Sequence, residues 1–218
     1  MGATVKMMAD RATPFSDSEL DALKHLGFGA IAGYLGGYTP HPWSADDFRR
    51  AIHKVGPVLP IWVISPHETG IAAGKAAGQK TVQAMRDKWR PGRGRYVVID
   101  VEIVYYVGRP TVQAVMAWRD VVAEGGYRPV LYSGRTVIEA VTGKEPVPHH
   151  LSAGWSGVWL AHWVQRAFRP VPQLIDMDTR WHSLAGRRAW QYAGSVGAAG
   201  MTIDASVTDM ALNPAILP

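Results

Sequence analysis

The sequence contains no cysteine among its 218 residues. This absence excludes disulfide bonds, thiolate zinc sites and a cysteine nucleophile. The chain also lacks a long apolar run, because the stretch Pro57–Ser65 falls far short of the roughly 20 residues that a membrane-spanning helix requires. Its first residues contain no apolar core of the kind found in secretory signals, so we expect neither a signal peptide nor a membrane span.

Charged residues are also scarce, at 19%, whereas hydrophobic residues make up 47% of the chain. That balance provides enough apolar surface for a folded core and excludes a predominantly disordered chain. The formal net charge of +5 makes the protein basic without making it a polycation. The sequence shows no internal repeat, low-complexity tract or linker, and its length suits one large domain. We therefore predict a single domain over residues 1–218.

Apolar segments typical of strands alternate with amphipathic segments along most of the chain. Ser16 and Ser44 each precede acidic residues in the pattern that begins a helix, and Gly27 follows the first helical segment. Strands with following helices are expected at residues 4–8, 30–35, 58–64, 96–102 and 129–133. Beyond residue 150 the helical signal fades, and three further strands are expected at residues 158–163, 189–192 and 201–204.

Alternating strands and helices imply right-handed crossovers and a parallel sheet. Eight strand candidates, the first five followed by helices, predict an α/β fold: a single TIM-like (β/α) barrel with an irregular, helix-poor last third. The alternative is an open, doubly wound sheet.

Asp100 and Glu102 stand at the end of the most continuous apolar strand, two positions apart. Side chains two positions apart on a strand point to the same side, and in a barrel the carboxyl ends of the strands carry the active site. Two carboxylates so close together raise one pKa, as a general acid requires. The alternative reading is that one acid caps the next element and the other is solvated.

Two further acids are expected at the same end of the barrel. Asp10 ends the first strand and Asp204 ends the eighth, and these strands become neighbours when a barrel closes. Four carboxylates on one rim suit glycoside hydrolysis, which needs a protonated acid and a carboxylate beside the scissile bond. A metal could bind the same acids, but no histidine stands at ligand spacing among them, so we expect no metal and no other cofactor.

Aromatic residues gather where helices are fewest, between residues 155 and 190. The faces of Trp and Tyr stack on sugar rings while their N–H and O–H groups form hydrogen bonds. For any single Trp the alternative is packing in the core. The candidates for substrate binding are Trp62, Tyr132, Trp159, Trp163, Trp190 and Tyr192.

A basic run at residues 86–95 contains five cations and one acid. It precedes the fourth strand, so a barrel places it on the face opposite the four acids. We therefore interpret it as a solvated turn, and nucleic-acid binding through this run is the disfavoured alternative.

The order of these motifs resembles that of the lysozyme-like barrels of glycoside hydrolase family 25. It resembles more closely a related group of glycoside-hydrolase-like domains found in actinobacteria and their phages. The resemblance is carried by the segments Val98–Glu102, Leu131–Ser133, Val158–Ala161, Trp190–Tyr192 and Ile203–Asp204. It implies that Glu102 is the proton donor. It also implies that Asp100, Asp10 and Asp204 are the accompanying acids of the strands.

We therefore expect a glycoside hydrolase that acts on cell-wall polysaccharide, in particular peptidoglycan. Glu102 would protonate the leaving oxygen, and Asp100 would stabilise the positive transition state or orient a substrate carbonyl. The alternative is a non-catalytic wall-binding or structural module, such as a virion or tail component whose partners include other virion proteins. Without a signal peptide, the protein would reach the bacterial wall through lysis, a virion or a dedicated secretion system.

Overall fold

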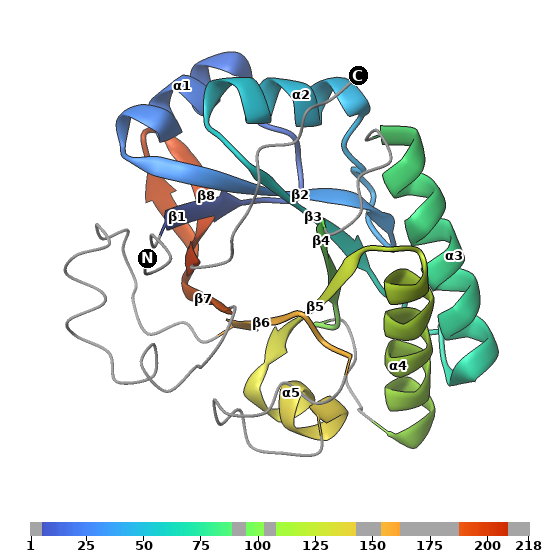
Figure 1. The fold of residues 1–218 in the computed structure, drawn as a ribbon. Helices are drawn as coiled ribbons and strands as arrows, with labels where there is room; N and C mark the ends of the chain where they lie inside the picture. Colours follow the sequence, from blue (N-terminus) through green and yellow to red (C-terminus); the bar gives the residue numbers. More distant parts are fainter. Residues whose placement is uncertain (1–5, 89–94, 103–107, 143–153, 162–187, 209–218) are drawn as a thin grey trace, which may run out of the picture.

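The computed structural model describes residues 6–88, 95–102, 108–142, 154–161 and 188–208. Within these residues eight strands close into one barrel, each hydrogen-bonded to the next and the last to the first (Figure 1). The strands are β1 (Lys6–Asp10), β2 (Phe28–Gly37), β3 (Val58–Val63), β4 (Tyr96–Asp100), β5 (Arg128–Gly134), β6 (Gly157–Ala161), β7 (Arg188–Ala198) and β8 (Met201–Thr208). The helices are α1 (Asp17–His25), α2 (Ala45–Lys54), α3 (Gly70–Lys88), α4 (Arg109–Glu124) and α5 (Arg135–Thr142).

The closed barrel confirms the predicted fold class and excludes the open, doubly wound sheet. Strands β1 to β7 pair in parallel, whereas β8 is antiparallel to both β7 and β1. The reversal follows from the connection between β7 and β8, a tight turn at Ala199 and Gly200 with φ of 48° and 78°. Such a turn joins antiparallel strands directly and leaves no room for a crossover helix.

Two of the predicted helix starts appear as full capping boxes. The hydroxyl of Ser16 accepts the backbone N–H of Glu19, whose carboxylate accepts the N–H of Ser16 at 2.7 Å. Ser44 and Asp47 make the same reciprocal pair at the start of α2. Each box satisfies backbone donors that the first helical turn leaves without a partner.

Some strands are longer than the sequence predicts. β2 continues through Gly36 and Gly37, beyond the strand expected at residues 30–35, because it pairs there with Trp62 and Val63 of β3. β7 extends to Ala198 because its hairpin with β8 continues to the turn. Among the helices of the described ranges, none is long and apolar enough to cross a membrane.

Side chains alternate between the barrel interior and the layer outside it. One buried cluster contains only strand residues and therefore fills the barrel; it includes Met8, Val98, Tyr132 and Trp159. The other also contains helix residues such as Trp118, and therefore lies between the strands and the helices. Strand parity thus decides which side chains reach the mouth of the barrel.

Helices α3 and α4 lie side by side on the outside of the barrel (Figure 1) and approach each other at glycine. A Cβ at Gly74 would lie 2.1 Å from the backbone oxygen of Ala114. Nearby, the indole N–H of Trp118 donates to the hydroxyl of Thr81 at 2.8 Å, in a buried contact. The close approach therefore depends on the missing side chain at position 74.

We predict that Gly74→Ala destabilises the protein by about 2 kcal/mol or more, because the α4 backbone cannot move away from the added methyl group. The clash outweighs the ~1 kcal/mol that alanine gains over glycine within a helix. Thermal unfolding measures the effect. The control is Gly197→Ala, where a Cβ would meet no atom within 4 Å. Equal melting temperatures for the two variants would contradict the close approach.

Candidate active site

The four predicted acids come together at one end of the barrel. Asp10 ends β1 and is paired in register with Asp204, and Asp100 ends β4. Asp10, Asp100 and Asp204 have the parity of the interior cluster, and Glu102 follows Asp100 by two residues. Because β8 runs antiparallel, its beginning lies at the end where the parallel strands finish. The structure therefore brings the four acids together as the sequence predicted, although Asp204 lies within the antiparallel strand β8 and not at its end.

The acids differ in exposure. Asp10 and Asp100 are buried, at 3% and 4% exposed, whereas Asp204 is partly exposed and Glu102 is exposed. The two deeper carboxyls thus form the floor of the site, and the other two are open to a ligand.

Burial and mutual repulsion raise the pKa of both deep acids. Burial raises the pKa of Asp10 well above its usual value, and the charges of Asp204, Glu102 and Asp100 add to this effect. The pKa of Asp100 rises to about 8, first through burial and then through the charge of Glu102. The backbone N–H of Glu102, which donates to Asp100 Oδ1 at 3.0 Å, partly offsets that rise. With a pKa of about 8, Asp100 is mainly protonated at pH 7, and the pKa of Asp10 is shifted in the same direction.

The two accessible acids also have raised pKa values. Desolvation of the Glu102 carboxylate raises its pKa although the residue as a whole is exposed, and the hydroxyl of Tyr132, 2.9 Å from Oε1, opposes the rise. Desolvation raises the pKa of Asp204, while the backbone N–H of Ser195 opposes the rise by donating to Oδ1 at 2.5 Å. A raised pKa on an accessible carboxyl is what a general acid needs near neutral pH.

The nearest cation in the sequence does not neutralise the cluster. Arg11 follows Asp10, but its guanidinium binds both carboxylate oxygens of Glu19, at 2.6 and 2.7 Å. This pairing lowers the pKa of Glu19 to about 2. Among the residues that the structure describes, no salt bridge joins a lysine or arginine to any of the four acids. Their repulsion is relieved by protons and by neutral donors.

Two of the aromatic candidates lie inside the barrel. Tyr132 is bonded to Glu102 and belongs to the site. Trp159 is 0% exposed, and the centroid of its ring lies 4.6 Å from that of Tyr132. Its indole N–H donates a hydrogen bond to the hydroxyl of Ser206 at 3.2 Å. Trp159 therefore supports Tyr132 from below as part of the core.

Three other aromatic candidates lie on the outer side of the barrel wall, because they have the opposite strand parity. Trp62 packs against Gly36, and Trp190 packs against Tyr192 with ring centroids 5.9 Å apart. All three belong to the cluster that includes the helices and are at most 7% exposed. These three rings therefore lie away from the acids. The sequence predicted that they contact substrate, and their position in the structure does not agree with that prediction. Trp163, the remaining candidate, lies outside the described residues.

Three residues that the sequence did not single out contact the acids or lie among them. Tyr34 lies on β2 and packs against the interior cluster. Burial raises the pKa of its hydroxyl, and the charges of Asp10 and the other acids add to the rise, so the hydroxyl lies near these acids. Gln191 accepts a hydrogen bond from Tyr132. Ser195 has a φ of 52°, in the left-handed region, within an irregular part of β7. Parity could have identified Gln191, a polar residue between two aromatics on a strand, but nothing local indicates Ser195.

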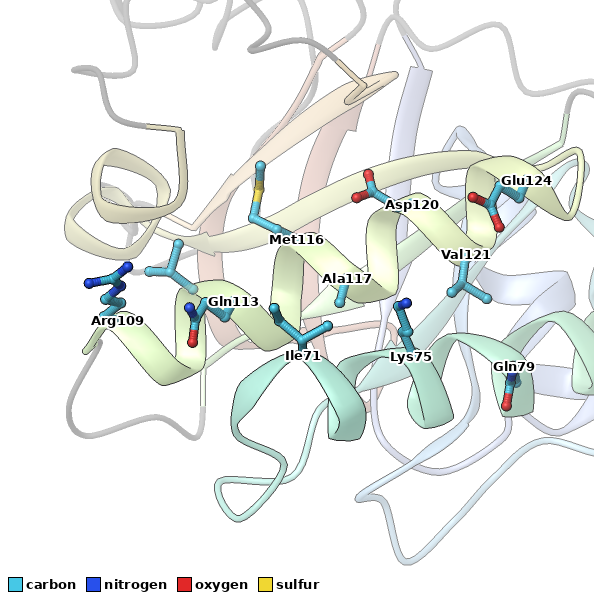
Figure 2. A pocket seen from close by; sticks show the side chains of 11 residues that line it. Ile71, Lys75, Gln79, Arg109, Gln113, Met116, Ala117, Asp120, Val121 and Glu124 are labelled. Carbon is cyan, nitrogen blue, oxygen red and sulfur yellow. The ribbon is translucent and has the colours of Figure 1, made fainter.

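A groove of about 850 Å³ lies elsewhere, between α3 and α4 on the outside of the barrel (Figure 2). Its lining includes Ile71, Lys75, Met116 and Glu124. None of the four acids lines it, so it is separate from the site. Within the described ranges, no group of three or more His, Asp or Glu side chains is arranged to hold a metal ion.

Comparison with solved structures supports the fold. An uncharacterised protein from B. stearothermophilus matches with a TM-score of 0.64 and 18% identity, over 92% of this chain and 94% of that one. A family 25 glycosyl hydrolase from Bacillus anthracis matches with a TM-score of 0.60 and 11% identity, over 93% and 88%. The modular Cpl-1 endolysin, solved with a peptidoglycan analogue, matches with a TM-score of 0.57 and 14% identity, over 95% of this chain but 55% of that one.

No family model and no curated protein sequence matches the chain. At these identities the likeness shows the fold: an eight-stranded barrel like that of family 25 lysozymes and endolysins.

We predict that Asp100→Asn stabilises the protein at pH 8 and has little effect near pH 4. The pKa of Asp100 is higher in the folded state, at about 8, than its ordinary value of 3.8. Between these pH values the folded state retains a proton that the unfolded chain has lost, so stability falls as pH rises. Asparagine removes this penalty. It should raise the melting temperature at pH 8 by about 2–4 °C for each kcal/mol recovered.

The control is Asp87→Asn, which removes an exposed carboxylate from α3. Melting curves recorded from pH 4 to pH 8 should show a growing difference from wild type for Asp100→Asn only. A difference independent of pH would contradict the raised pKa of Asp100.

Proposed function

We propose that the protein is a glycoside hydrolase acting on cell-wall polysaccharide, with the muramyl linkage of peptidoglycan as its substrate bond. The observation that carries this proposal is the site itself. An accessible glutamate with a raised pKa, Glu102, stands among three further carboxyls at the carboxyl end of a barrel. Glycoside hydrolysis needs such a proton donor next to a second carboxyl.

The geometry suggests a role for each acid. Glu102 is the proton donor, because it is the most accessible of the four and is held by Tyr132. Asp100, neutral below about pH 8, can donate a hydrogen bond to a substrate carbonyl and thereby orient it. Asp204, partly exposed and bonded by the N–H of Ser195, provides a carboxylate that faces the positive transition state. Asp10 lies at the floor of the site, where burial and the charges of the other three acids hold its pKa high.

The comparisons support the same substrate class. The matching Cpl-1 structure holds a peptidoglycan analogue, and the Bacillus anthracis match is described as a family 25 glycosyl hydrolase. We extend that substrate class to this chain on the basis of its acids. Membership of the glycoside-hydrolase-like group of actinobacteria and their phages, and action at the bacterial wall after lysis, in a virion or by dedicated secretion, belong to the same proposal.

One observation favours the alternative, a non-catalytic wall-binding or structural module. Three of the aromatic side chains expected to stack on sugar rings, Trp62, Trp190 and Tyr192, are buried outside the barrel. Stacking platforms are what many sugar sites use for affinity. A module that retains the acids for polar binding alone would bind wall fragments without cleaving them.

Glu102→Gln separates the two functions. Glutamine keeps the size and hydrogen-bonding reach of the side chain but has no proton to transfer. General acid catalysis contributes about 10²–10⁴-fold, so we expect cleavage of purified peptidoglycan to fall by that factor while binding persists. Released reducing ends measure cleavage, and co-sedimentation with insoluble wall measures binding.

The matched control is Glu124→Gln, the same change at an exposed position on α4. This variant should cleave like wild type. Equal cleavage by the Glu102 variant would remove Glu102 from the mechanism. Binding without cleavage by the wild-type protein would establish the non-catalytic alternative.

A further inference from the structure

The hydroxyl of Tyr132 lies between two oxygen atoms at the mouth of the barrel. It is 2.9 Å from Oε1 of Glu102 and is also hydrogen-bonded to Oε1 of Gln191. A phenol has one proton, so it can donate to only one of these oxygens at a time. The other oxygen then lacks a partner or has to bring a proton of its own.

Only one of the two oxygens can bring a proton. The side-chain carbonyl of Gln191 is an acceptor, whereas a carboxyl group can be protonated. Both contacts are therefore satisfied together when Glu102 is in its acid form. Glu102 then donates to the oxygen of Tyr132, and Tyr132 donates to Gln191. When Glu102 is ionised, the hydroxyl of Tyr132 donates its hydrogen bond to the carboxylate. The side-chain carbonyl of Gln191 then receives no hydrogen bond from Tyr132.

The orientation of the Gln191 amide agrees with this direction of donation. Gln191 is 0% exposed, its Oε1 is placed against the hydroxyl of Tyr132, and its side chain lies near enough to Asp204 to lower the pKa of that carboxyl. Nε2 makes no hydrogen bond of standard geometry to any residue that the structure describes. In the reversed orientation, the carbonyl oxygen would face Asp204 and two acceptors would oppose each other.

We propose that Gln191 is a positioning residue that keeps Glu102 in its acid form by competing for the hydroxyl proton of Tyr132. The inference rests on the proposed hydrolase function, in which Glu102 must hold a proton before the bond breaks. In that step the O–H bond of Glu102 breaks and an O–H bond forms on the leaving oxygen. Tyr132 then turns its proton to the new carboxylate and stabilises it.

Other groups around Glu102 also favour its acid form, so the contribution of Gln191 has to be separated from theirs. The charge of Asp204 on β8 raises the pKa of Glu102, and Asp100 and Asp10 interact with it from β4 and β1. From β2, Tyr34 interacts with the same acids. None of these effects requires Tyr132, whereas the effect of Gln191 does.

A double-mutant cycle with Gln191→Met and Tyr132→Phe isolates that dependence. Methionine matches the length of glutamine and removes the acceptor. We expect Gln191→Met to lower the pKa of Glu102 by about one, since the hydroxyl proton of Tyr132 becomes free to bind the carboxylate. In the Tyr132→Phe background the same change should leave that pKa nearly unaltered.

The measurement is an NMR titration of the ¹³C-labelled Glu102 carboxyl in the intact protein, which needs no enzymatic activity. The matched control is Ser206→Ala, which alters the residue paired with Gln191 but no hydrogen bond to Glu102. It should leave the pKa of Glu102 unchanged. Gln191→Ala is the second variant if methionine prevents folding, because it also removes the acceptor.

An unchanged pKa in Gln191→Met, or an equal fall in both backgrounds, overturns the positioning role. If the titration shows the expected pattern and the basic limb of the pH profile for cleavage moves to lower pH with it, the inference holds in full. If the wild-type protein cleaves no peptidoglycan at any pH, the proposed function fails, and the NMR titration still decides whether Gln191 controls the proton of Tyr132.

Discussion

Antiparallel pairing of β8 with β1 is the constraint on which the site depends. It closes the barrel and places Asp204 directly opposite Asp10. A parallel eighth strand would reach this end of the barrel only with its last residue. Because β8 is antiparallel, its first half lies at this end and its second half continues into the barrel wall. The tight turn at Ala199 and Gly200 reverses the chain, and the register of β8 with β1 then pairs two of the four acids. Site geometry and fold are determined by the same hydrogen bonds.

Closure brings acids together without a cation, and the molecule responds with protons and neutral donors. Arg11, the nearest candidate, is held by Glu19 and contributes its charge to the start of α1. An arginine paired with Asp10 would have lowered the pKa values in the cluster and favoured the ionised carboxylates. Without it, Asp100 has a pKa of about 8 and Asp10 is raised as well. Burial, with the repulsion between the acids added to it, is thus what raises the pKa values of these carboxyls.

The sequence predicts the barrel and the place of the four acids because both follow from periodicity. Asp10 and Asp100 end apolar strands and Glu102 follows two residues later, so these three meet at one rim. Asp204 lies within β8 and reaches the same rim because that strand is antiparallel to β1. The sequence predicts the aromatic contacts poorly, since Trp and Tyr fit both a sugar site and a core, and only parity distinguishes these. Trp190 and Tyr192 fall outside the barrel while Gln191, between them, falls inside. The donation from Ser195 depends on an irregular backbone that no local pattern announces.

The same parity argument changes how recognition at this site is understood. Within the described residues, the side chains that meet the acids are hydroxyls and an amide, from Tyr34, Tyr132 and Gln191. Such groups bind through directional hydrogen bonds, whose strength depends on the protonation state of each partner. Under the proposed function, affinity and proton donation are therefore coupled: a change that alters which carboxyl holds a proton also alters which hydrogen bonds a bound sugar can accept. In a site that binds its ligand by stacking on aromatic rings, affinity would not depend on which carboxyl holds a proton.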